Sequence, residues 1–151
     1  MFEDCRGLAL TTTSEQAGVA FDHAVDGYLS YRTDMAARLD ALLAIDPNFG
    51  MAHCLKGYLF MMSFRADALP AARAASADTW RATVGGTPRE HDHAGALDAW
   101  VAGDPEQAVA VWNQILRDHP LDILAFKLAH FVNFWLGRPE VMLASRSLRI
   151  R

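Results

Sequence analysis

Six histidines in a chain of 151 residues are the side chains best suited to metal binding or acid–base chemistry. The densest group is His91-Asp92-His93. On a helix, His91 and His93 point about 200° apart, so one metal ion cannot be bound by both from a single face. We therefore interpret this group as polar residues near the start of a helix.

A second arrangement takes one histidine from each of three successive helical units, His53, His93 and His130. Stacked helices could bring these residues together, but the three occupy different positions within their units. A metal site needs ligands at a shared depth and direction. We predict no metal, no cofactor and no catalytic residue. A shared role for the three histidines stays open.

Motifs, cysteines and net charge argue against several other classes of function. No nucleophile elbow, phosphate loop or paired-cysteine zinc pattern is present. Cys5 and Cys54 are interpreted as ordinary thiols in a reducing compartment. The net charge of −4, without a basic stripe, argues against a nucleic-acid partner. The longest apolar region, around residues 57–64, is too short to span a bilayer, so we expect a cytoplasmic chain without a membrane partner.

Alanine and leucine are common, and no segment of strand length alternates between apolar and polar residues. Helix is therefore predicted throughout. Thr87-Pro88 followed by Glu90 is typical of a capping box at a helix start. About seven helices are expected, with the third over roughly 48–63 and the fourth over roughly 67–84. Residues that can cap helix starts are Ser14, Asp34, Asp67, Thr87 and Asp104.

The sequence Gly-x-Pro-Glu occurs twice, at Gly103 and Gly137, 34 residues apart. Each copy is interpreted as a turn between helices, in which glycine accepts a positive φ and proline starts the next helix. A period of 34 residues is typical of tetratricopeptide repeats. The fold prediction is an all-α, tetratricopeptide-type α-solenoid of antiparallel helix pairs. Its parts are an N-terminal extension (1–13) and an array (14–151) with units at about 16–49, 50–88, 89–122 and a partial 123–151.

Four segments carry a more specific resemblance: 7–17 (GLALTTTSEQA), 46–57 (DPNFGMAHCLKG), 87–96 (TPREHDHAGA) and 108–137 (AVAVWNQILRDHPLDILAFKLAHFVNFWLG). Together they are spread over residues 7–137 of the chain, which resembles the tetratricopeptide repeat protein 38 family. Members of that family are typically longer, with further helical pairs, so the resemblance implies an N-terminal portion. The family has no agreed catalytic activity, so the resemblance does not point to a reaction.

Methionines and aromatic residues on the first helix of each unit predict an apolar concave groove. Its expected lining is Met51, Tyr58, Met62, His93, Leu97, Trp100, Lys127, Phe131 and Trp135. We expect a non-catalytic protein-interaction or scaffold module that binds an apolar peptide or an amphipathic helix. Self-association through the C-terminal helix is also expected. The alternative is the N-terminal segment of a larger helical small-molecule-binding or enzyme-like protein, whose site would use clustered histidines from this segment.

Overall fold

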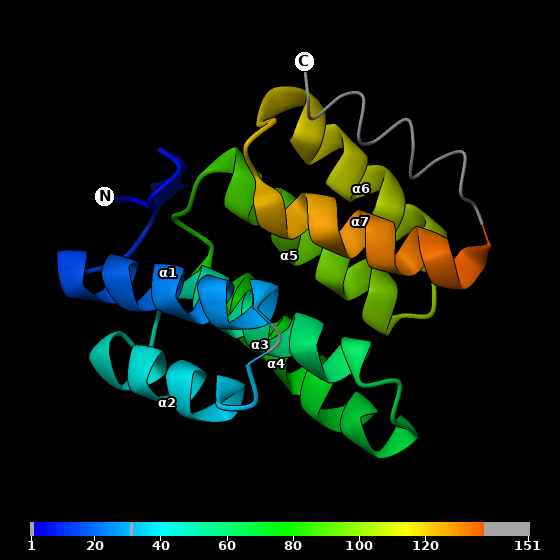
Figure 1. Cartoon of the computed structure of the whole chain (residues 1–151), viewed down its shortest axis with the longest axis horizontal. Coiled ribbons are helices and arrows are strands. Elements are labelled where there is room, and N and C mark those ends of the chain that lie inside the picture. The colour runs from blue at the N-terminus through cyan, green and yellow to red at the C-terminus, as the bar shows by residue number, and fades with distance from the viewer. Residues whose placement is uncertain (1, 31, 138–151) are drawn as a thin grey trace.

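The computed structural model describes residues 2–30 and 32–137, which form seven α-helices (Figure 1). These are α1 (Glu15–Leu29), α2 (Met35–Ile45), α3 (Gly50–Met62), α4 (Leu69–Ala82), α5 (Pro88–Val101), α6 (Pro105–Asp118) and α7 (Ile123–Leu136). The prediction of an all-α chain with about seven helices is confirmed for these residues. The helix predicted to start after Gly137 lies outside them. None of the described helices is long and apolar enough to cross a membrane.

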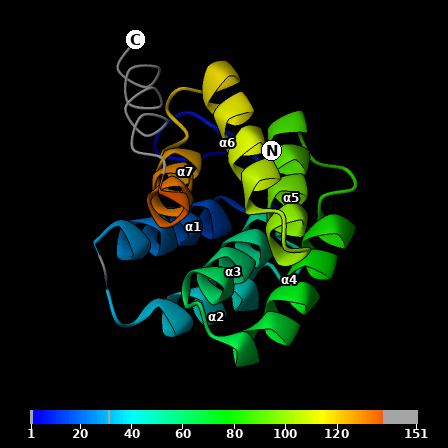
Figure 2. The same ribbon diagram turned by 90° about the vertical axis from the view of Figure 1, so that its right-hand side faces the viewer.

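The helices pack in sequential pairs: α1 against α2, α3 against α4, and α5 against α6. Helix α5 also contacts α3 and α4, and α7 packs against α6. Figure 2 shows α1 and α7 on the same side of α3. One apolar core runs through these contacts, with Leu55, Leu97, Trp112 and Leu128 fully buried within it. Burial of this surface is the main favourable contribution to folding.

Side-chain caps start several helices as predicted. Ser14 accepts a hydrogen bond from the backbone N–H of Ala17 at the start of α1. Thr87 and Glu90 form the predicted capping box at the start of α5. Asp34 is the residue before α2, but its carboxylate pairs with Arg38 and makes no capping hydrogen bond. Local sequence signals therefore mark where these helices begin. Whether the marked side chain makes the capping hydrogen bond depends on its other contacts, as at Asp34.

The prediction that Asp67 caps the fourth helix is wrong. Asp67 lies in a short 3-10 helix, η1 (Ala66–Ala68), and α4 begins at Leu69. The Arg65 guanidinium donates two hydrogen bonds to the Asp67 carboxylate, at 3.0 and 2.7 Å. These charge-assisted bonds engage both carboxylate oxygens and compete with capping.

The two Gly-x-Pro-Glu sequences begin with glycines in the predicted left-handed conformation. Gly103 has a φ of 89° and Gly137 a φ of 72°. Gly137 ends α7, while Gly103 joins α5 to α6. A residue with a Cβ atom is strained at such φ values, which explains glycine at both places.

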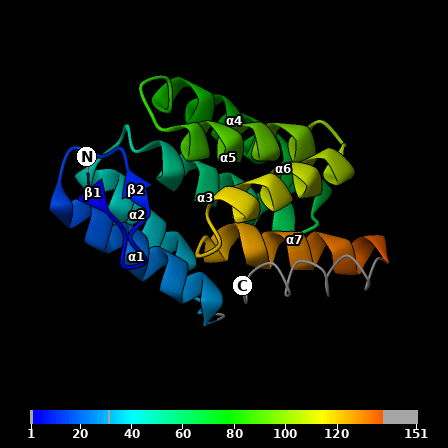
Figure 3. The same cartoon turned by 90° about the horizontal axis from the view of Figure 1, so that it is seen from above.

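The first residues form a small hairpin that the sequence did not predict. Strands β1 (Phe2–Glu3) and β2 (Ala9–Leu10) pair antiparallel, at the α1 end of the molecule (Figure 3). The Asp4 carboxylate accepts hydrogen bonds from the backbone N–H groups of Arg6 and Leu8, which fixes the turn. Two-residue strands are too short to show alternation, so periodicity could not reveal them. Leu10 is fully buried, so the hairpin is anchored in the core.

Candidate functional site

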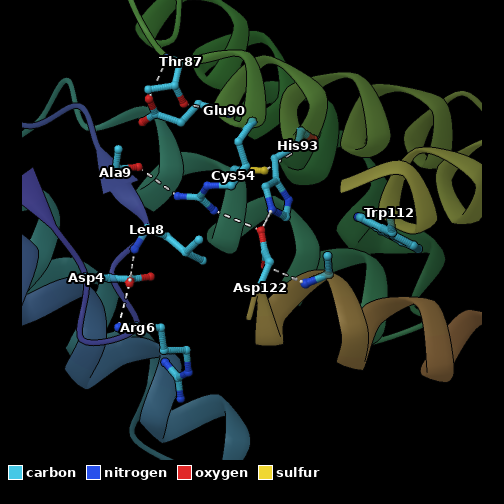
Figure 4. Close-up of polar contacts among 12 residues, drawn as sticks. Asp4, Arg6, Leu8, Ala9, Cys54, Thr87, Glu90, His93, Trp112 and Asp122 are labelled. Carbon is cyan, nitrogen blue, oxygen red and sulfur yellow. Dashed lines mark hydrogen bonds and ion pairs between the residues drawn. The ribbon is translucent and has the colours of Figure 1, made fainter. Parts of the chain in front are cut away.

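A chain of buried polar side chains joins α3, α5, α6 and the start of α7. Figure 4 shows the part of it around His93 and Asp122. The hydroxyl of Tyr58 lies 2.8 Å from Nδ1 of His93, and the indole N–H of Trp112 donates to the same hydroxyl at 3.1 Å. Nε2 of His93 lies 2.8 Å from a carboxylate oxygen of Asp122. Four elements far apart in the sequence are thus joined by three hydrogen bonds.

Asp122 has further hydrogen-bond partners besides His93. It also accepts hydrogen bonds from Arg89 at 3.0 Å and from the backbone N–H of Ala125 at 3.0 Å. Burial favours the neutral acid, but the charge and hydrogen bond of His93, together with Arg89, more than offset this and hold the pKa of Asp122 well below its usual value. The carboxylate therefore stays ionised and caps α7 at the same time.

The N-terminal hairpin is attached to this network through Arg89. A second N–H of the Arg89 guanidinium donates to the backbone carbonyl of Ala9 at 2.9 Å. The backbone N–H and hydroxyl of Thr11 donate to Glu90 at 3.1 and 2.7 Å. These bonds connect the first residues of the chain to α5, 79 positions away for the Thr11–Glu90 pair.

A parallel attachment fixes the next residues to the end of α2. The Thr12 hydroxyl and the Thr13 backbone N–H donate to Asp46 at 2.6 and 3.1 Å. Burial acts to raise the pKa of Asp46, but these hydrogen bonds and one from the Asn48 backbone lower it below the usual value. The segment before α1 is therefore bonded to both the α2–α3 connection and α5.

The reactive groups of the network are buried, including Cys54, whose thiol lies 3.6 Å from the backbone carbonyl oxygen of His93. Burial raises the pKa of the Cys54 thiol to about 12, so Cys54 is a protonated thiol near neutral pH rather than a nucleophilic thiolate. Burial likewise raises the pKa of Tyr58 well above its usual value. The hollow beside Arg89 and Asp122 has a volume of about 10 Å³, enough for about one water molecule. The network therefore joins helices in the interior, with Tyr58, His93 and Trp112 fully buried.

The histidines considered together in the sequence occupy separate environments. Nε2 of His53 lies 2.7 Å from the carbonyl of Pro47, whereas His93 belongs to the buried network. His130 packs against the ring of Phe126 with a centroid distance of 4.3 Å. Within residues 2–30 and 32–137, no three His, Cys, Asp or Glu side chains are grouped so that they could hold a metal ion.

A different feature offers space for a ligand: an apolar pocket of about 590 Å³ between α1, α3 and α7. This volume lies in the range of ligand-binding pockets. Its described lining is Tyr28, Leu59, Met62, Phe126, Lys127, His130, Phe131, Phe134 and Trp135. Phe134 and Trp135 expose 66% and 61% of their surfaces, although such large apolar residues are usually covered.

Four of the predicted groove residues line this pocket: Met62, Lys127, Phe131 and Trp135. The others lie elsewhere, in the buried interior, and are Met51, Tyr58, His93, Leu97 and Trp100. Helix α3 is apolar on several faces, so its sequence could not separate the face that packs against α5 from the face that lines a pocket.

Several pocket residues were missed from the sequence, namely Tyr28, Leu59, Phe126 and His130. Helix α7 is also apolar on most of its surface, which hides its exposed face. The signal available in the sequence was the spacing of Phe131, Phe134 and Trp135, which places three large apolar side chains on one face of the helix.

No family model matches the chain, and no solved structure matches it significantly. The fold therefore defines only a broad class: a helical protein built from sequential helix pairs. Within the described residues, this helical protein contains a buried polar network around His93 and Asp122 and an apolar pocket between α1, α3 and α7.

Proposed function

We propose that the chain is a non-catalytic protein-interaction module of the tetratricopeptide type, and that its apolar pocket binds an amphipathic helix of a partner protein. The observation that carries this proposal is the pocket between α1, α3 and α7, with Phe134 and Trp135 exposed at it. Exposed apolar surface of this kind typically marks an interaction site.

The repeat identity rests on three observations that support each other. The Gly-x-Pro-Glu sequences are 34 residues apart, their glycines have positive φ, and the helices pack in sequential pairs. Tetratricopeptide arrays combine this period with paired helices. The resemblance to the tetratricopeptide repeat protein 38 family agrees with this assignment.

The chemistry of the lining favours a helix over a charged peptide end. Met62 is unbranched and adapts to irregular apolar shapes, while Phe131 and Trp135 offer flat aromatic surfaces as anchors. Among the described residues of the lining, Lys127 is the only lysine or arginine. A single cation contributes little to holding a carboxylate. An amphipathic helix with apolar residues at i, i+3, i+4 and i+7 matches this lining.

Binding is expected to depend on the apolar anchors. The probe is a synthetic 16-residue helical peptide with leucine at those positions, measured by calorimetry. Trp135→Ala and Met62→Ala are each expected to weaken binding by about tenfold or more, equivalent to about 1.4 kcal/mol, because each removes a contact at the pocket. Lys127→Ala is expected to have a smaller effect, and added salt should change the affinity little.

Trp80→Ala is the matched control, because Trp80 is also an exposed tryptophan but lies on α4, outside the pocket. It should bind the peptide as the unmodified chain does. A peptide with the same composition in scrambled order should bind weakly. Equal losses in Trp80→Ala and Trp135→Ala, or a large loss on adding salt, would contradict the proposal. Sedimentation of the chain alone tests whether a second copy, rather than a partner, occupies the pocket.

A further inference from the structure

Phe64, in the connection between α3 and α4, occupies a backbone position that glycine fills after two other helices of this chain. Its φ is 52°, compared with 89° for Gly103 after α5 and 72° for Gly137 at the end of α7. In all three, the backbone N–H donates to the carbonyl oxygen three residues earlier, at 3.3, 3.0 and 3.1 Å respectively. Among the described residues, Phe64 is the one residue other than glycine with a positive φ.

A phenylalanine at such a position has a steric cost that glycine avoids. In the left-handed region the Cβ atom lies close to the following carbonyl oxygen, which is why glycine is preferred at helix ends of this kind. The Phe64 side chain is 55% exposed, so burial in the core does not explain it either. A bulky residue keeps this conformation only where surrounding contacts impose it. The contacts of the Phe64 ring are therefore informative.

The Phe64 ring packs against two aromatic side chains of α7. It stacks on Phe131 with a centroid distance of 5.5 Å and an interplanar angle of 14°. It meets the ring of Trp135 edge-on, at 4.9 Å and 67°. Both geometries are favourable for aromatic pairs. Since Phe131 and Trp135 line the apolar pocket, Phe64 contacts two of its lining residues from outside the described lining.

Trp135 needs such a contact if its ring is to keep one orientation. Its side chain is 61% exposed, and exposed side chains change rotamer rapidly when nothing restrains them. Fixing a mobile side chain at the moment of binding costs free energy, so a ring that is already restrained binds more favourably. The Phe64 ring supplies this restraint from another segment of the chain, before a ligand arrives.

We infer that Phe64 is a positioning residue for the pocket, whose ring holds Phe131 and Trp135 in the orientation in which they line it. The inference rests on the proposed function, since it concerns the same pocket and the same kind of ligand. It accounts for the strained backbone and the exposed ring together, because glycine satisfies the backbone but offers no ring to restrain α7.

The first test observes Trp135 in the free chain. The four tryptophans are labelled with 5-fluorotryptophan, and each fluorine NMR resonance is assigned by replacing one tryptophan with phenylalanine. Phe64→Gly removes the ring and suits a positive φ, so the fold should be retained, with the same helix content by circular dichroism. The Trp135 resonance should move towards the value of a solvent-exposed fluorotryptophan. The resonances of Trp80 and Trp112, which have no aromatic contact with Phe64, should stay in place.

The second test measures binding of the 16-residue leucine-faced peptide by calorimetry. Phe64→Gly should bind it about fivefold more weakly than the unmodified chain. Phe64→Tyr keeps the stacking ring, so it should retain both the affinity, within about twofold, and the position of the Trp135 resonance. Val84→Gly is the matched control, because it places glycine in another connection between helices, at an exposed residue outside the pocket. It should change neither quantity.

A double-mutant cycle then shows whether Phe64 acts through Trp135. In a Trp135→Ala background, Phe64→Gly should cost about twofold at most, because the main side chain that it restrains is already gone. Equal losses in the two backgrounds would overturn the inference, since the Phe64 ring would then act on the ligand independently of Trp135.

The outcomes separate this inference from the proposed function. If the peptide does not bind the unmodified chain, the proposed function fails, while the fluorine spectra of the free chain still decide whether Phe64 restrains Trp135. A Trp135 resonance that is unchanged in Phe64→Gly would overturn the inference. If the peptide binds the unmodified chain and Phe64→Gly equally well, the pocket does not depend on Phe64, and the inference is overturned while the proposed function stands.

Discussion

Replacing Asp122 with alanine is expected to lower the free energy of unfolding by about 3–5 kcal/mol. Asp122 accepts hydrogen bonds from Arg89 and His93 in a buried environment, and it caps α7 through the backbone of Ala125. Without it, the Arg89 charge is left buried and uncompensated, and the first turn of α7 loses its cap. Urea unfolding followed by circular dichroism measures the loss.

The same carboxylate should make stability depend on acid pH. The pKa of Asp122 is lower in the folded chain than the value of about 3.9 expected when unfolded. Its stabilising contribution is therefore fully present above that unfolded pKa and is lost as pH falls below it, towards the folded pKa. Asp46, whose pKa is also lowered, adds to the loss in the same direction. Asp122→Asn keeps the shape and should flatten this part of the pH profile.

Asp67→Ala is the control for these measurements. Asp67 also pairs with an arginine, Arg65, but both side chains are exposed, so solvent screens the pair. Its removal should change the urea midpoint far less than Asp122→Ala does. Similar losses in the two variants, or an acid profile that Asp122→Asn leaves unchanged, would show that the buried network does not stabilise the fold as described.

Trp112→Ala is expected to destabilise the chain by about 3–5 kcal/mol, mainly through the cavity that it leaves. Trp112 is fully buried on α6, with its ring centroid 5.7 Å from that of Tyr58 and 5.5 Å from that of Trp100. The change also removes the hydrogen bond that Trp112 donates to Tyr58. Thermal unfolding should therefore begin at a clearly lower temperature.

Trp80→Ala provides the comparison, because Trp80 is 43% exposed on α4. It should shift the unfolding midpoint much less than Trp112→Ala. Trp112→Phe, which keeps most of the ring volume, should recover part of the stability. If the two alanine variants unfold together, Trp112 is not at the centre of the core.

The helices were predictable because their signals are local. Ser14, Thr87 and Asp104 act as caps in the structure, and Gly103 and Gly137 adopt the conformation that their turn sequence requires. Each such signal depends on a few neighbouring residues. Asp67 failed as a predicted cap because Arg65, two residues away, binds its carboxylate.

The buried network was not predictable, since its members come together only through tertiary packing. Arg89 and Asp122 were visible merely as residues near helix starts, 33 positions apart. Tyr58 and His93 were assigned to a groove from the repeat register, in which the first helix of each unit faces the concave surface. Only contacts between helices decide which face is buried.

The pocket was predicted only in part, again because contacts between helices decide which faces line it. The aromatic run in α7 indicated Phe131 and Trp135. Phe64, which packs against both of them from outside the described lining, gave no periodic signal because it lies in a connection between helices. Its positive φ and its contacts with α7 are visible only in three dimensions.

Selection of peptides from a random 16-residue library on the immobilised chain tests the proposed interaction most directly. A Met62→Ala/Trp135→Ala double variant serves as the counter-target, since both residues line the pocket. The expected result is enrichment of sequences with apolar residues at i, i+3 or i+4, and i+7, which bind the unmodified chain and not the double variant. Enrichment of acidic peptides with a free C-terminal carboxylate, bound equally by both proteins, would contradict the proposal.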